Sequence, residues 1–322
     1  ALAERRDSLE FGSWEPSFEF DSEGNATAVR YEQQTESHRV IEMLMILANE
    51  QVAGYLADRR LPSLFRVHER PEPQSVAFLA EQLASLDIPT PALPDPEKLT
   101  PREAEGLARE ASRLVAREAE RRGHGRAAYT SLVLRSLKPA FYGHQNIGHA
   151  GLGSPAYSHF TSPIRRYPDL VAHRALLSVL GAGEIEPDRA EIREAGWWCS
   201  ERERESMVIE RDADKVCAAF LLERELYESG WSREFEGEVS GVIGAGAFVR
   251  FGGDLGDVYE GFLPARRMPT ERFDLNPTET ALVGRRSGRE VRLGDPATVR
   301  VDGIEAPRGR TDLVAVTEDG GR

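Results

Sequence analysis

The sequence predicts two parts of different fold class, a helix-rich part over residues 1–232 and an all-β barrel over residues 233–322. Two observations carry this prediction. Apolar residues recur at helical spacing through most of the chain as far as Ser229, and Gly230 then acts as a stop. Beyond Arg233, short segments rich in β-forming residues alternate with glycine-rich turns. That spacing is typical of a small closed barrel such as an OB-fold.

The first expected elements are a hairpin and a long helix. Residues 18–29 hold two β-forming segments around a Glu-Gly-Asn turn, and residues 37–59 repeat apolar side chains with helical period. Glu42 and Asn49 are seven residues apart, so they lie on nearly the same side of this helix. Such a polar stripe lines a site in some helices and is more often the solvent face, and both interpretations stay open here.

Further helices are expected in the middle of the chain. One of them carries a capping box, with Thr100 as N-cap, Pro101 at the first helical position and Glu103 three residues after the cap. Residues 142–158 are rich in glycine and histidine, which predicts irregular structure close to a site. The expected helices cover residues 75–86, 101–122 and 127–137, and a charged helical tract covers residues 188–229. About 40 helical residues would span roughly 60 Å, enough to brace two domains.

The barrel segment carries candidate nucleic-acid contacts. OB barrels bind single strands through aromatic stacking platforms beside basic grooves. Phe235, Phe248 and Arg250 are therefore candidate RNA-binding residues. Because phenylalanines also fill barrel cores, at least two of Phe235, Phe248, Phe251 and Phe262 are expected to be buried. The expected strands cover residues 235–242, 247–251, 258–263, 290–293, 297–301 and 313–316.

Charge is distributed unevenly along the chain. The formal net charge is −13, from 54 acidic and 41 basic residues, which by itself is not typical of a nucleic-acid-binding protein. Residues 124–174, however, hold six basic residues against one acidic residue, and five of the seven histidines. This predicts a basic site in an acidic body, suited to a polyanion in a confined channel.

Cysteine content and hydropathy give predictions about location and partners. The two cysteines, Cys199 and Cys217, form neither a disulfide framework nor a zinc spacing, which favours a reducing, cytoplasmic compartment. No apolar run of membrane-spanning length and no signal peptide is evident, so no membrane partner is expected. We expect a monomer. The chain begins at Ala1 without Met, and we expect it to be a fragment of a longer protein.

The most informative stretch is residues 159–170, with the sequence HFTSPIRRYPDL. Ser162 and Pro163 are residue types favoured at a helix N-cap and first position, so a helix start is expected there, with Arg165 and Arg166 in its first turn. Pro168 would then interrupt that helix and start a second one, which ends at Gly181. Guanidinium groups match phosphate oxygens bidentately. The stretch is either a rigid cationic corner that grips a phosphate or a surface turn with two solvated arginines.

The residues of a hydrolytic metal site are not evident. Phosphodiester hydrolysis usually uses clustered carboxylates that hold divalent metal ions. Asp169 is isolated, and the pair Asp212 and Asp214 lies in the charged helical tract, where a solvated surface position is expected. His144, His149 and His159 lack the tight spacing of transition-metal ligands. No metal ligand is predicted in this chain.

The chain resembles the RNB family of exoribonucleases, the family of ribonuclease II and ribonuclease R. The most specific match is residues 159–170, preceded by residues 134–140 and Gly148-His149 and followed by His173-Arg174. Weaker matches occur in the same order as in the family, at residues 37–38, 41–42, 48–50, 66–71, 201–202 and 210–211. Residues from about 233 onward resemble the terminal OB-fold RNA-binding domain of these enzymes.

The resemblance implies an α/β RNB catalytic domain, here its helix-rich C-terminal part over residues 1–232, followed by the barrel. It implies a 3′→5′ exoribonuclease that threads single-stranded RNA into a narrow channel and releases nucleoside monophosphates. Arg165 resembles the arginine at the scissile phosphate, Glu42 the glutamate at the terminal nucleotide, and Glu210 a glutamate near the channel floor. The implied catalytic residues are Arg165, Arg166 and Glu42, and the implied RNA contacts in this part are His159, Thr161, Ser162, Tyr167 and Glu210.

The resemblance also implies a missing part. The family's magnesium-binding aspartate cluster lies in the first half of the RNB domain and has no match here, so Mg²⁺ is expected for the complete enzyme with ligands outside this chain. We therefore expect the chain alone to be inactive. The alternative is a non-catalytic RNA-binding or scaffold protein that keeps the fold, and the acidic net charge also allows a protein-interaction module.

Overall fold

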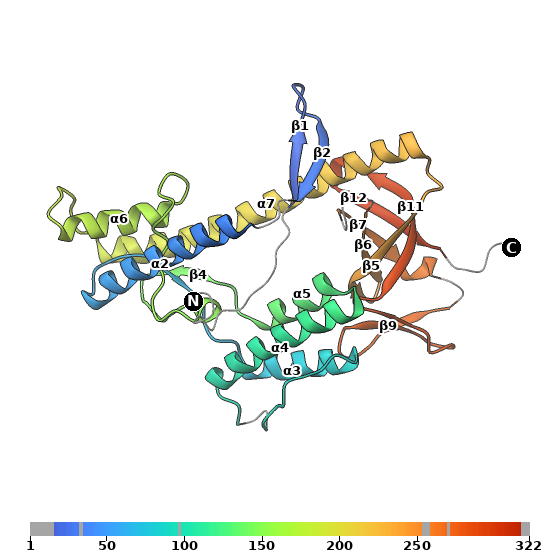
Figure 1. Cartoon of the computed structure of the whole chain (residues 1–322), viewed down its shortest axis with the longest axis horizontal. Helices are drawn as coiled ribbons and strands as arrows, with labels where there is room; N and C mark the ends of the chain where they lie inside the picture. Colours follow the sequence, from blue (N-terminus) through green and yellow to red (C-terminus); the bar gives the residue numbers. More distant parts are fainter. Residues whose placement is uncertain (1–15, 32–34, 96–97, 253–257, 269–270, 317–322) are drawn as a thin grey trace.

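The computed structural model describes residues 16–31, 35–95, 98–252, 258–268 and 271–316. Figure 1 shows helices gathered at one end of the molecule and a β-barrel at the other, with the long helix α7 (Arg189–Ser229) reaching both. The expected order of a helix-rich part followed by an all-β part is therefore present in the structure.

The N-terminal hairpin and helix form close to their expected limits. β1 (Pro16–Phe20) pairs antiparallel with β2 (Ala26–Tyr31), and the hairpin lies against α7, where Arg224 Nη2 donates to Thr27 O at 2.6 Å. α2 (Glu36–Asp58) follows, capped by Thr35. The interpretation of its polar stripe as a solvent face is wrong for Asn49, whose side chain is 3% exposed.

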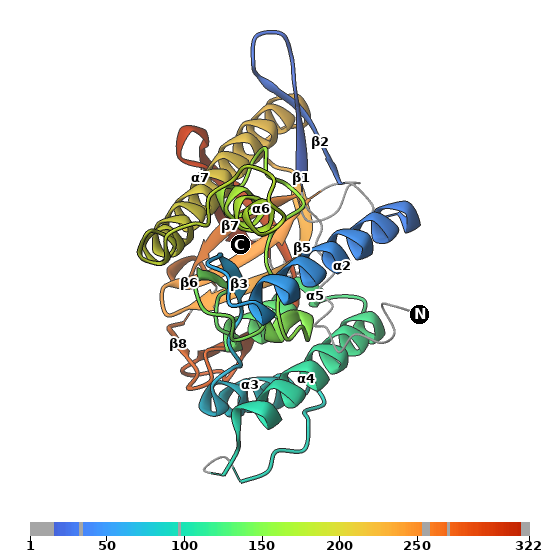
Figure 2. The same cartoon turned by 90° about the vertical axis from the view of Figure 1, so that its left-hand side faces the viewer.

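Three helices pack into a separate bundle below α2, as Figures 1 and 2 show. Their bounds are α3 (Pro73–Ser85), α4 (Pro101–Arg122) and α5 (Arg126–Ser136). The capping box of α4 is confirmed: Thr100 accepts from the Glu103 N–H, and Glu103 accepts from the Thr100 N–H at 2.9 Å. Gly123 then ends α4 with a φ of 75°, a conformation that glycine adopts without strain.

Histidines fasten the glycine-rich loop after α5 to a small antiparallel pair, β3 (Phe65–Val67) and β4 (Phe141–Gly143). His68 Nδ1 accepts from the Gly151 N–H at 2.7 Å, so its proton lies on Nε2, which donates to Lys138 O at 2.7 Å. His149 Nδ1 accepts from the Leu152 N–H, and His159 Nδ1 lies 2.9 Å from the Tyr142 hydroxyl. The loop expected to be irregular is thus held by buried, neutral imidazoles.

Burial sets the charge state of this cluster. Loss of hydration, followed by the charge of the neighbouring His68, lowers the pKa of His149 to about 3. Burial likewise lowers the pKa of His159 to about 3, followed by the positive charge of Arg166. Burial also raises the pKa of Tyr142 to about 12. All three side chains are therefore uncharged at neutral pH.

The structure places a turn where the sequence predicted a helix start. The N–H groups of Arg165 and Arg166 both donate to Ser162 O, at 3.2 and 3.1 Å, and α6 (Tyr167–Val179) begins only at Tyr167. Pro168 lies in the first turn of α6, where its fixed φ and missing N–H suit a helix start. The prediction of a helix that begins at Ser162 was wrong. The predicted second helix, which ends before Gly181, is confirmed.

The last two helices pack together, and α7 continues into the barrel. Val171 of α6 and Ile192 of α7 share a buried cluster with Leu64. At its other end, α7 buries Leu221, Leu222 and Leu226 within the barrel core. The core therefore crosses the predicted boundary at residue 232.

Five strands close the barrel in the order β11-β12-β7-β6-β5, and β11 pairs back onto β5. All pairings are antiparallel except the parallel contact of β12 with β7. The six strands expected from the sequence are present. Five of them form the barrel, and the sixth, β10, belongs to a three-stranded sheet of order β10-β9-β8 that lies between β7 and β11 in the sequence. Strand bounds are β5 (Glu234–Ile243), β6 (Gly246–Phe251), β7 (Tyr259–Pro264), β8 (Phe273–Leu275), β9 (Ala281–Gly284), β10 (Glu290–Arg292), β11 (Pro296–Glu305) and β12 (Arg310–Ala315).

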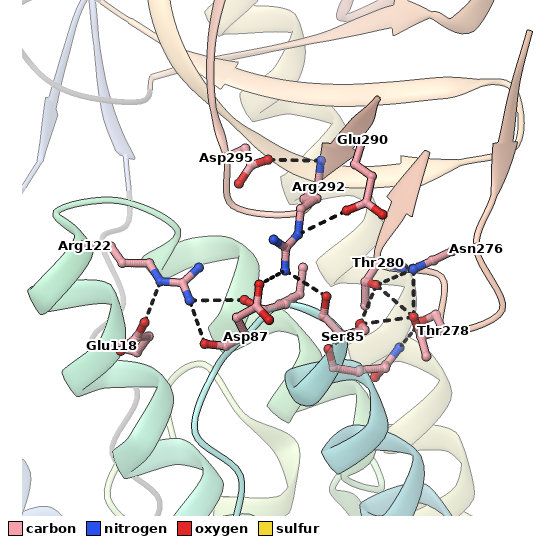
Figure 3. Close-up of polar contacts among 12 residues, drawn as sticks. Ser85, Asp87, Glu118, Arg122, Asn276, Thr278, Thr280, Glu290, Arg292 and Asp295 are labelled. Carbon is pink, nitrogen blue, oxygen red and sulfur yellow. Dashed lines mark hydrogen bonds and ion pairs between the residues drawn. The ribbon is translucent and has the colours of Figure 1, made fainter. Parts of the chain in front are cut away.

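The barrel part is docked firmly onto the helical bundle (Figure 3). Arg292 of β10 donates from Nη2 to Ser85 O at 2.8 Å and to Asp87 Oδ2 at 2.9 Å, and Ser85 Oγ lies 2.8 Å from Thr280 Oγ1. Leu293, 2% exposed, joins the buried cluster of α3, α4 and α5. The two parts of the molecule therefore share both a polar and an apolar junction.

Two further findings bear on the expected location. In the part of the chain that the structure describes, α2 is long and apolar enough to cross a membrane, so the prediction that no apolar run reaches membrane-spanning length was wrong for Glu36–Asp58. A single such helix is weak support for a membrane span, because core helices of globular proteins meet the same two criteria. Cys199 and Cys217 are both free thiols. The expected cytoplasmic location and absence of a membrane partner stay predictions.

The junction gives a first test, at Gly294. Gly294 has a φ of 85°, and an added Cβ would lie 2.3 Å from the ring of the fully buried Tyr129. We expect Gly294→Ala to lower the free energy of unfolding by about 3 kcal/mol or more, since it adds overpacking to backbone strain. Urea unfolding followed by circular dichroism measures this.

Gly288→Ala is the matched control for the junction. Gly288 also has a positive φ, of 67°, but an added Cβ would meet nothing within 4 Å. This variant should cost only about 1–2 kcal/mol of backbone strain. Equal losses in the two variants would show that Tyr129 does not pack on Gly294.

The buried histidines give a test of pH dependence. The folded pKa of His149 and of His159 lies below the unfolded value, so below about pH 6.5 the unfolded chain binds protons that the folded chain does not. The free energy of unfolding should therefore fall as the pH drops from 7 to 5, by up to about 1.4 kcal/mol per pH unit for each imidazole.

A variant that removes one titrating imidazole checks the source of this slope. His159→Gln should reduce the slope by about one proton, measured from urea midpoints across this pH range. His144→Gln should leave it unchanged, because the His144 side chain is exposed to water in the folded protein as in the unfolded chain. Stability that is flat between pH 7 and pH 5 would contradict the neutral cluster.

Candidate nucleic-acid interface

Residues 159–169 form a rigid turn that we call the arginine corner. Its centre is the carboxylate of Asp169, which is 0% exposed. Asp169 Oδ1 accepts from the Ser162 N–H at 2.7 Å and from Arg166 Nη2 at 2.8 Å. Asp169 Oδ2 lies 2.8 Å from Arg166 Nε as an ion pair. The carboxylate thus ties the first helical turn of α6 back to the loop before it.

The two neighbouring arginines have different roles in this geometry. The Arg166 side chain is 21% exposed and is paired with Asp169, so its charge is largely satisfied within the protein. The Arg165 side chain is exposed and makes no hydrogen bond or ion pair with any residue that the structure describes. The sequence named both arginines as catalytic. The structure leaves Arg165 as the cation able to meet a ligand and makes Arg166 part of the corner's framework.

Side chains from α2 and α6 support the corner from behind. Asn49 of α2 donates from Nδ2 to the Tyr157 hydroxyl at 2.9 Å and accepts the Phe160 N–H on Oδ1 at 3.0 Å. His173 of α6 stacks on the Phe160 ring with 4.0 Å between centroids, and its Nε2 lies 2.9 Å from Phe160 O. The backbone that enters the corner is therefore fixed at both its N–H and its carbonyl.

The corner has a positive electrostatic environment. After burial, the causes that lower the pKa of His159 are the charges of Arg166 and Arg66, with His149 and Arg165 adding smaller effects. Arg66 is itself paired with Glu203 of α7 at 2.6 Å. Because Arg66 and Arg166 are each paired with a carboxylate, Arg165 is the member of this group whose charge is left to meet an anion among the described residues.

The other residues predicted to contact RNA near the arginine corner differ in their exposure to solvent. Tyr167 is 54% exposed at the start of α6, while Thr161 and Ser162 are half-buried. The half-buried His159 ring contacts the buried rings of Tyr142 and Tyr157, and its Nδ1 lies 2.9 Å from the Tyr142 hydroxyl. Tyr167, Thr161 and Ser162 therefore keep atoms open to a ligand, whereas His159 acts mainly as a packing residue.

The two predicted glutamates lie on long helices that border the corner. Glu42 is half-buried on α2, which packs beside α6, as Figure 2 shows. Glu210 is exposed near the middle of α7. The structure therefore brings α2 and its Glu42 to the same end of the molecule as Arg165, and it leaves Glu210 on the stretch of α7 between the corner and the barrel.

The structure of the barrel shows that one residue predicted to contact RNA is buried instead. Phe235 is 3% exposed and packs against Phe251 with 5.2 Å between ring centroids, so it is a core residue and cannot stack on a base. Phe251 is also fully buried, which confirms that at least two of the four phenylalanines are structural. Phe248 and Phe262 are cross-strand partners on the outer surface of β6 and β7, with 5.1 Å between centroids.

Arg250 lies on the same outer surface of the barrel, between Phe248 and the end of β6. Its Nε is 3.5 Å from Glu260 Oε2, and both side chains are well exposed. An exposed pair of this kind contributes little to stability and is easily exchanged for another partner. Phe248, Phe262 and Arg250 thus form a small aromatic and cationic surface, which we call the barrel face.

The described residues do not fit a magnesium site. Over the described ranges, no group of three or more His, Cys, Asp or Glu side chains lies close enough to hold a metal ion. The most buried carboxylate of the corner, Asp169, is committed to Arg166 and Ser162. No chemical step is therefore assigned to a metal bound by these residues.

Sequence reasoning missed the importance of Asn49 and Asp169. The sequence left open whether Asn49 lines a site or faces solvent, and it gave Asp169 no role beyond that of an isolated carboxylate. Asn49 does interrupt an otherwise apolar helical stripe, and Asp169 follows Arg166 by three residues, a spacing that lets side chains meet on a helix. Both residues therefore stand out in the sequence, but the contacts that Asn49 makes with Tyr157 and Phe160, and Asp169 with Ser162, depend on the tertiary fold.

Sequence comparison finds relatives along nearly the whole chain. Ribonuclease R of Escherichia coli K12 is 31% identical over 330 residues, covering 98% of this chain and 38% of the relative. Ribonuclease R of Aquifex aeolicus is 32% identical over 308 residues, covering 95% of this chain and 41% of the relative. The chain therefore spans about two fifths of the length of these curated relatives.

Structural comparison supports the same fold. The apo form of Mycoplasma genitalium RNase R matches 98% of this chain and 47% of its own, with a TM-score of 0.82 at 24% identity. The Dss1 exoribonuclease of Candida glabrata matches 98% of this chain with a TM-score of 0.65 at 19% identity. At this level of identity the likeness concerns the fold alone. The RNB domain model matches residues 2–182, which is more than half of the chain, and the chain therefore belongs to the RNB family.

Proposed function

We propose that this chain is the RNA-holding part of a hydrolytic exoribonuclease that degrades single-stranded RNA in the 3′→5′ direction to nucleoside monophosphates. The observation that carries the proposal is the state of Arg165, an exposed and unpaired guanidinium, among the described residues, on a turn fixed by a buried carboxylate. A fixed guanidinium donates paired hydrogen bonds to a phosphate and stabilises charge that develops on it during hydrolysis.

The relatives support this proposal. The ribonuclease R sequences match almost all of the chain, and Mycoplasma genitalium RNase R has been solved in complex with ribose methylated single-stranded RNA. Because the chain spans less than half of these proteins, the activity belongs to a larger unit. We propose Mg²⁺ as the cofactor of that unit, which would polarise the phosphate and activate water.

We further propose that residues 233–322 are an OB-fold RNA-binding domain and residues 1–232 the C-terminal part of the RNB catalytic domain. The closed five-stranded barrel supports the first assignment. The barrel face offers stacking for bases beside one arginine, as single-strand-binding barrels do. A monomer in the cytoplasm is the form we propose for the protein.

A second candidate is a non-catalytic RNA-binding protein. It is favoured by the lack of any metal-holding group among the described residues. Both candidates use the same corner to hold phosphate, so RNA binding does not separate them. A digest of 5′-labelled single-stranded RNA with Mg²⁺, run on this chain and on any longer version of the protein, does: shortening from the 3′ end by either would exclude the second candidate, and RNA that is bound but left intact by both would favour it.

Phosphate binding at the corner is tested by Arg165→Ala in the 322-residue chain. Loss of one charge-assisted contact should raise the Kd for single-stranded RNA about tenfold or more. It should also reduce the slope of log Kd against log salt by about 0.7. Fluorescence anisotropy of labelled RNA, without divalent metal and at several salt concentrations, measures both.

Arg102→Ala is the matched control for this measurement. It removes the same charge from an exposed position on α4. Its effect on affinity should be less than about twofold, because an exposed charge beyond the screening length contributes little. Equal losses in the two variants would mean that net charge, and not the corner, governs binding.

The barrel face is tested by Phe248→Ala. Loss of one stacking ring should weaken binding by about 1–3 kcal/mol. Phe78→Ala, which removes an exposed phenylalanine from α3, is the control and should leave affinity unchanged. If both variants bind RNA like the parent chain, the barrel face is not a stacking platform.

A further inference from the structure

The arginine corner contains a buried acidic residue beside the cation proposed to hold phosphate. An acid next to a phosphate site would normally oppose anion binding. Here the carboxylate of Asp169 is fully buried and contacts Ser162 and Arg166. This arrangement needs an explanation that the phosphate contact alone does not give.

We propose that Asp169 is a positioning residue: it fixes the turn that presents Arg165 and keeps Arg166 out of the ligand position. The inference rests on the proposed function, because it assumes that Arg165 meets a phosphate. Asp169 touches neither substrate nor reacting atoms in this account, and it acts through two neighbours.

The first neighbour is the backbone of Ser162. Its N–H is held by Asp169 Oδ1 at 2.7 Å, while its carbonyl accepts the N–H groups of Arg165 and Arg166. Ser162 is thus fixed at both of its backbone polar groups. Pro163, which follows it, has a fixed φ. The path from Ser162 to Arg165 therefore has little backbone freedom, so less conformational entropy is lost when Arg165 binds a ligand.

The second neighbour is the guanidinium of Arg166. It meets Asp169 through two nitrogen atoms, Nη2 and Nε, each 2.8 Å from a carboxylate oxygen. If both arginines were unpaired, a phosphate could bind either guanidinium, and the bound RNA would then have two alternative positions. Neutralising one of them leaves a single defined position for the anion.

A carboxylate suits this role better than an amide of the same shape. An asparagine with its oxygen in the place of Oδ1 would still accept from the Ser162 N–H and Arg166 Nη2, but its NH₂ group would face Arg166 Nε–H, which is also a donor. The guanidinium would then lose its negatively charged partner and one of its two contacts, which frees it to move toward the ligand position. Asp169→Asn is therefore expected to alter how Arg165 contributes to binding, beyond any general loss of stability.

A double-mutant cycle tests this coupling. The probe is a 5′-fluorescein-labelled single-stranded oligouridylate, bound to the full 322-residue chain without divalent metal. In the parent chain, Arg165→Ala should raise Kd about tenfold. In the D169N background, Arg165→Ala should raise Kd by less than about twofold, because Arg165 is no longer presented correctly.

Glu118→Gln controls for stability. Glu118 is a carboxylate of 5% exposure that is paired with Arg121 and Arg122 on α4, so it matches Asp169 in burial and partner type but lies in a different helix. In the E118Q background, Arg165→Ala should still raise Kd about tenfold. If D169N does not fold, R166K replaces it, since this change on a partly exposed side chain keeps the charge and loses the paired contact. Arg165→Ala should then cost less than about threefold.

The outcomes separate the two proposals. If Arg165→Ala costs about tenfold in the parent and again in the D169N or R166K background, the positioning role is overturned and the phosphate contact stands. If Arg165→Ala has no effect in the parent chain, the phosphate contact is overturned and the positioning role with it. If Arg165→Ala costs less than about twofold in the E118Q background as well, the effect belongs to stability and the inference is overturned.

Discussion

A single helix, α7, is part of two separate cores, and the rest of the structure depends on that connection. Near its N-terminal end, Ser200 Oγ accepts the Tyr142 N–H at 2.9 Å, which attaches α7 to the strand pair behind the arginine corner. At its C-terminal end, Leu222 and Leu226 are fully buried among barrel strands. Because 41 residues of helix span roughly 60 Å, the corner and the barrel are held at a set separation. A single strand of RNA that contacted both the arginine corner and the barrel would have to span the separation that α7 sets between them.

The corner itself shows how two identical side chains acquire different roles. Arg165 and Arg166 are neighbours in sequence, yet only Arg166 meets the buried carboxylate of Asp169. A buried ion pair gives little net stability, since desolvation opposes its Coulomb attraction. Its contribution in our proposal is geometric: it holds Arg166 in the framework of the corner and leaves Arg165 exposed. The aromatic and amide contacts of Phe160 with His173 and Asn49 extend this framework into α6 and α2.

Sequence reasoning reached the elements because local patterns determine them. The capping box at Thr100 and the apolar periodicity of residues 37–59 each have a local physical cause, and both elements formed within a residue or two of the expected limits. The predicted helix from Ser162 did not form because the backbone is extended at Arg166, with φ −129° and ψ 119°, so α6 begins only at Tyr167. Phe235 and Phe248 could not be told apart until strand register assigned one ring to the barrel core and the other to its surface. The choice between Arg165 and Arg166 likewise depended on a tertiary contact.

We propose, in short, that Arg165 and not Arg166 holds an RNA phosphate while Asp169 keeps the corner fixed. The most direct measurement is a crystal structure of this chain bound to a short ribose methylated single-stranded RNA. The account predicts a phosphate oxygen within hydrogen-bond distance, about 3 Å, of the Arg165 guanidinium, with the Arg166–Asp169 pair unchanged. RNA bound away from the corner, or a phosphate held by an Arg166 that has left Asp169, would contradict it.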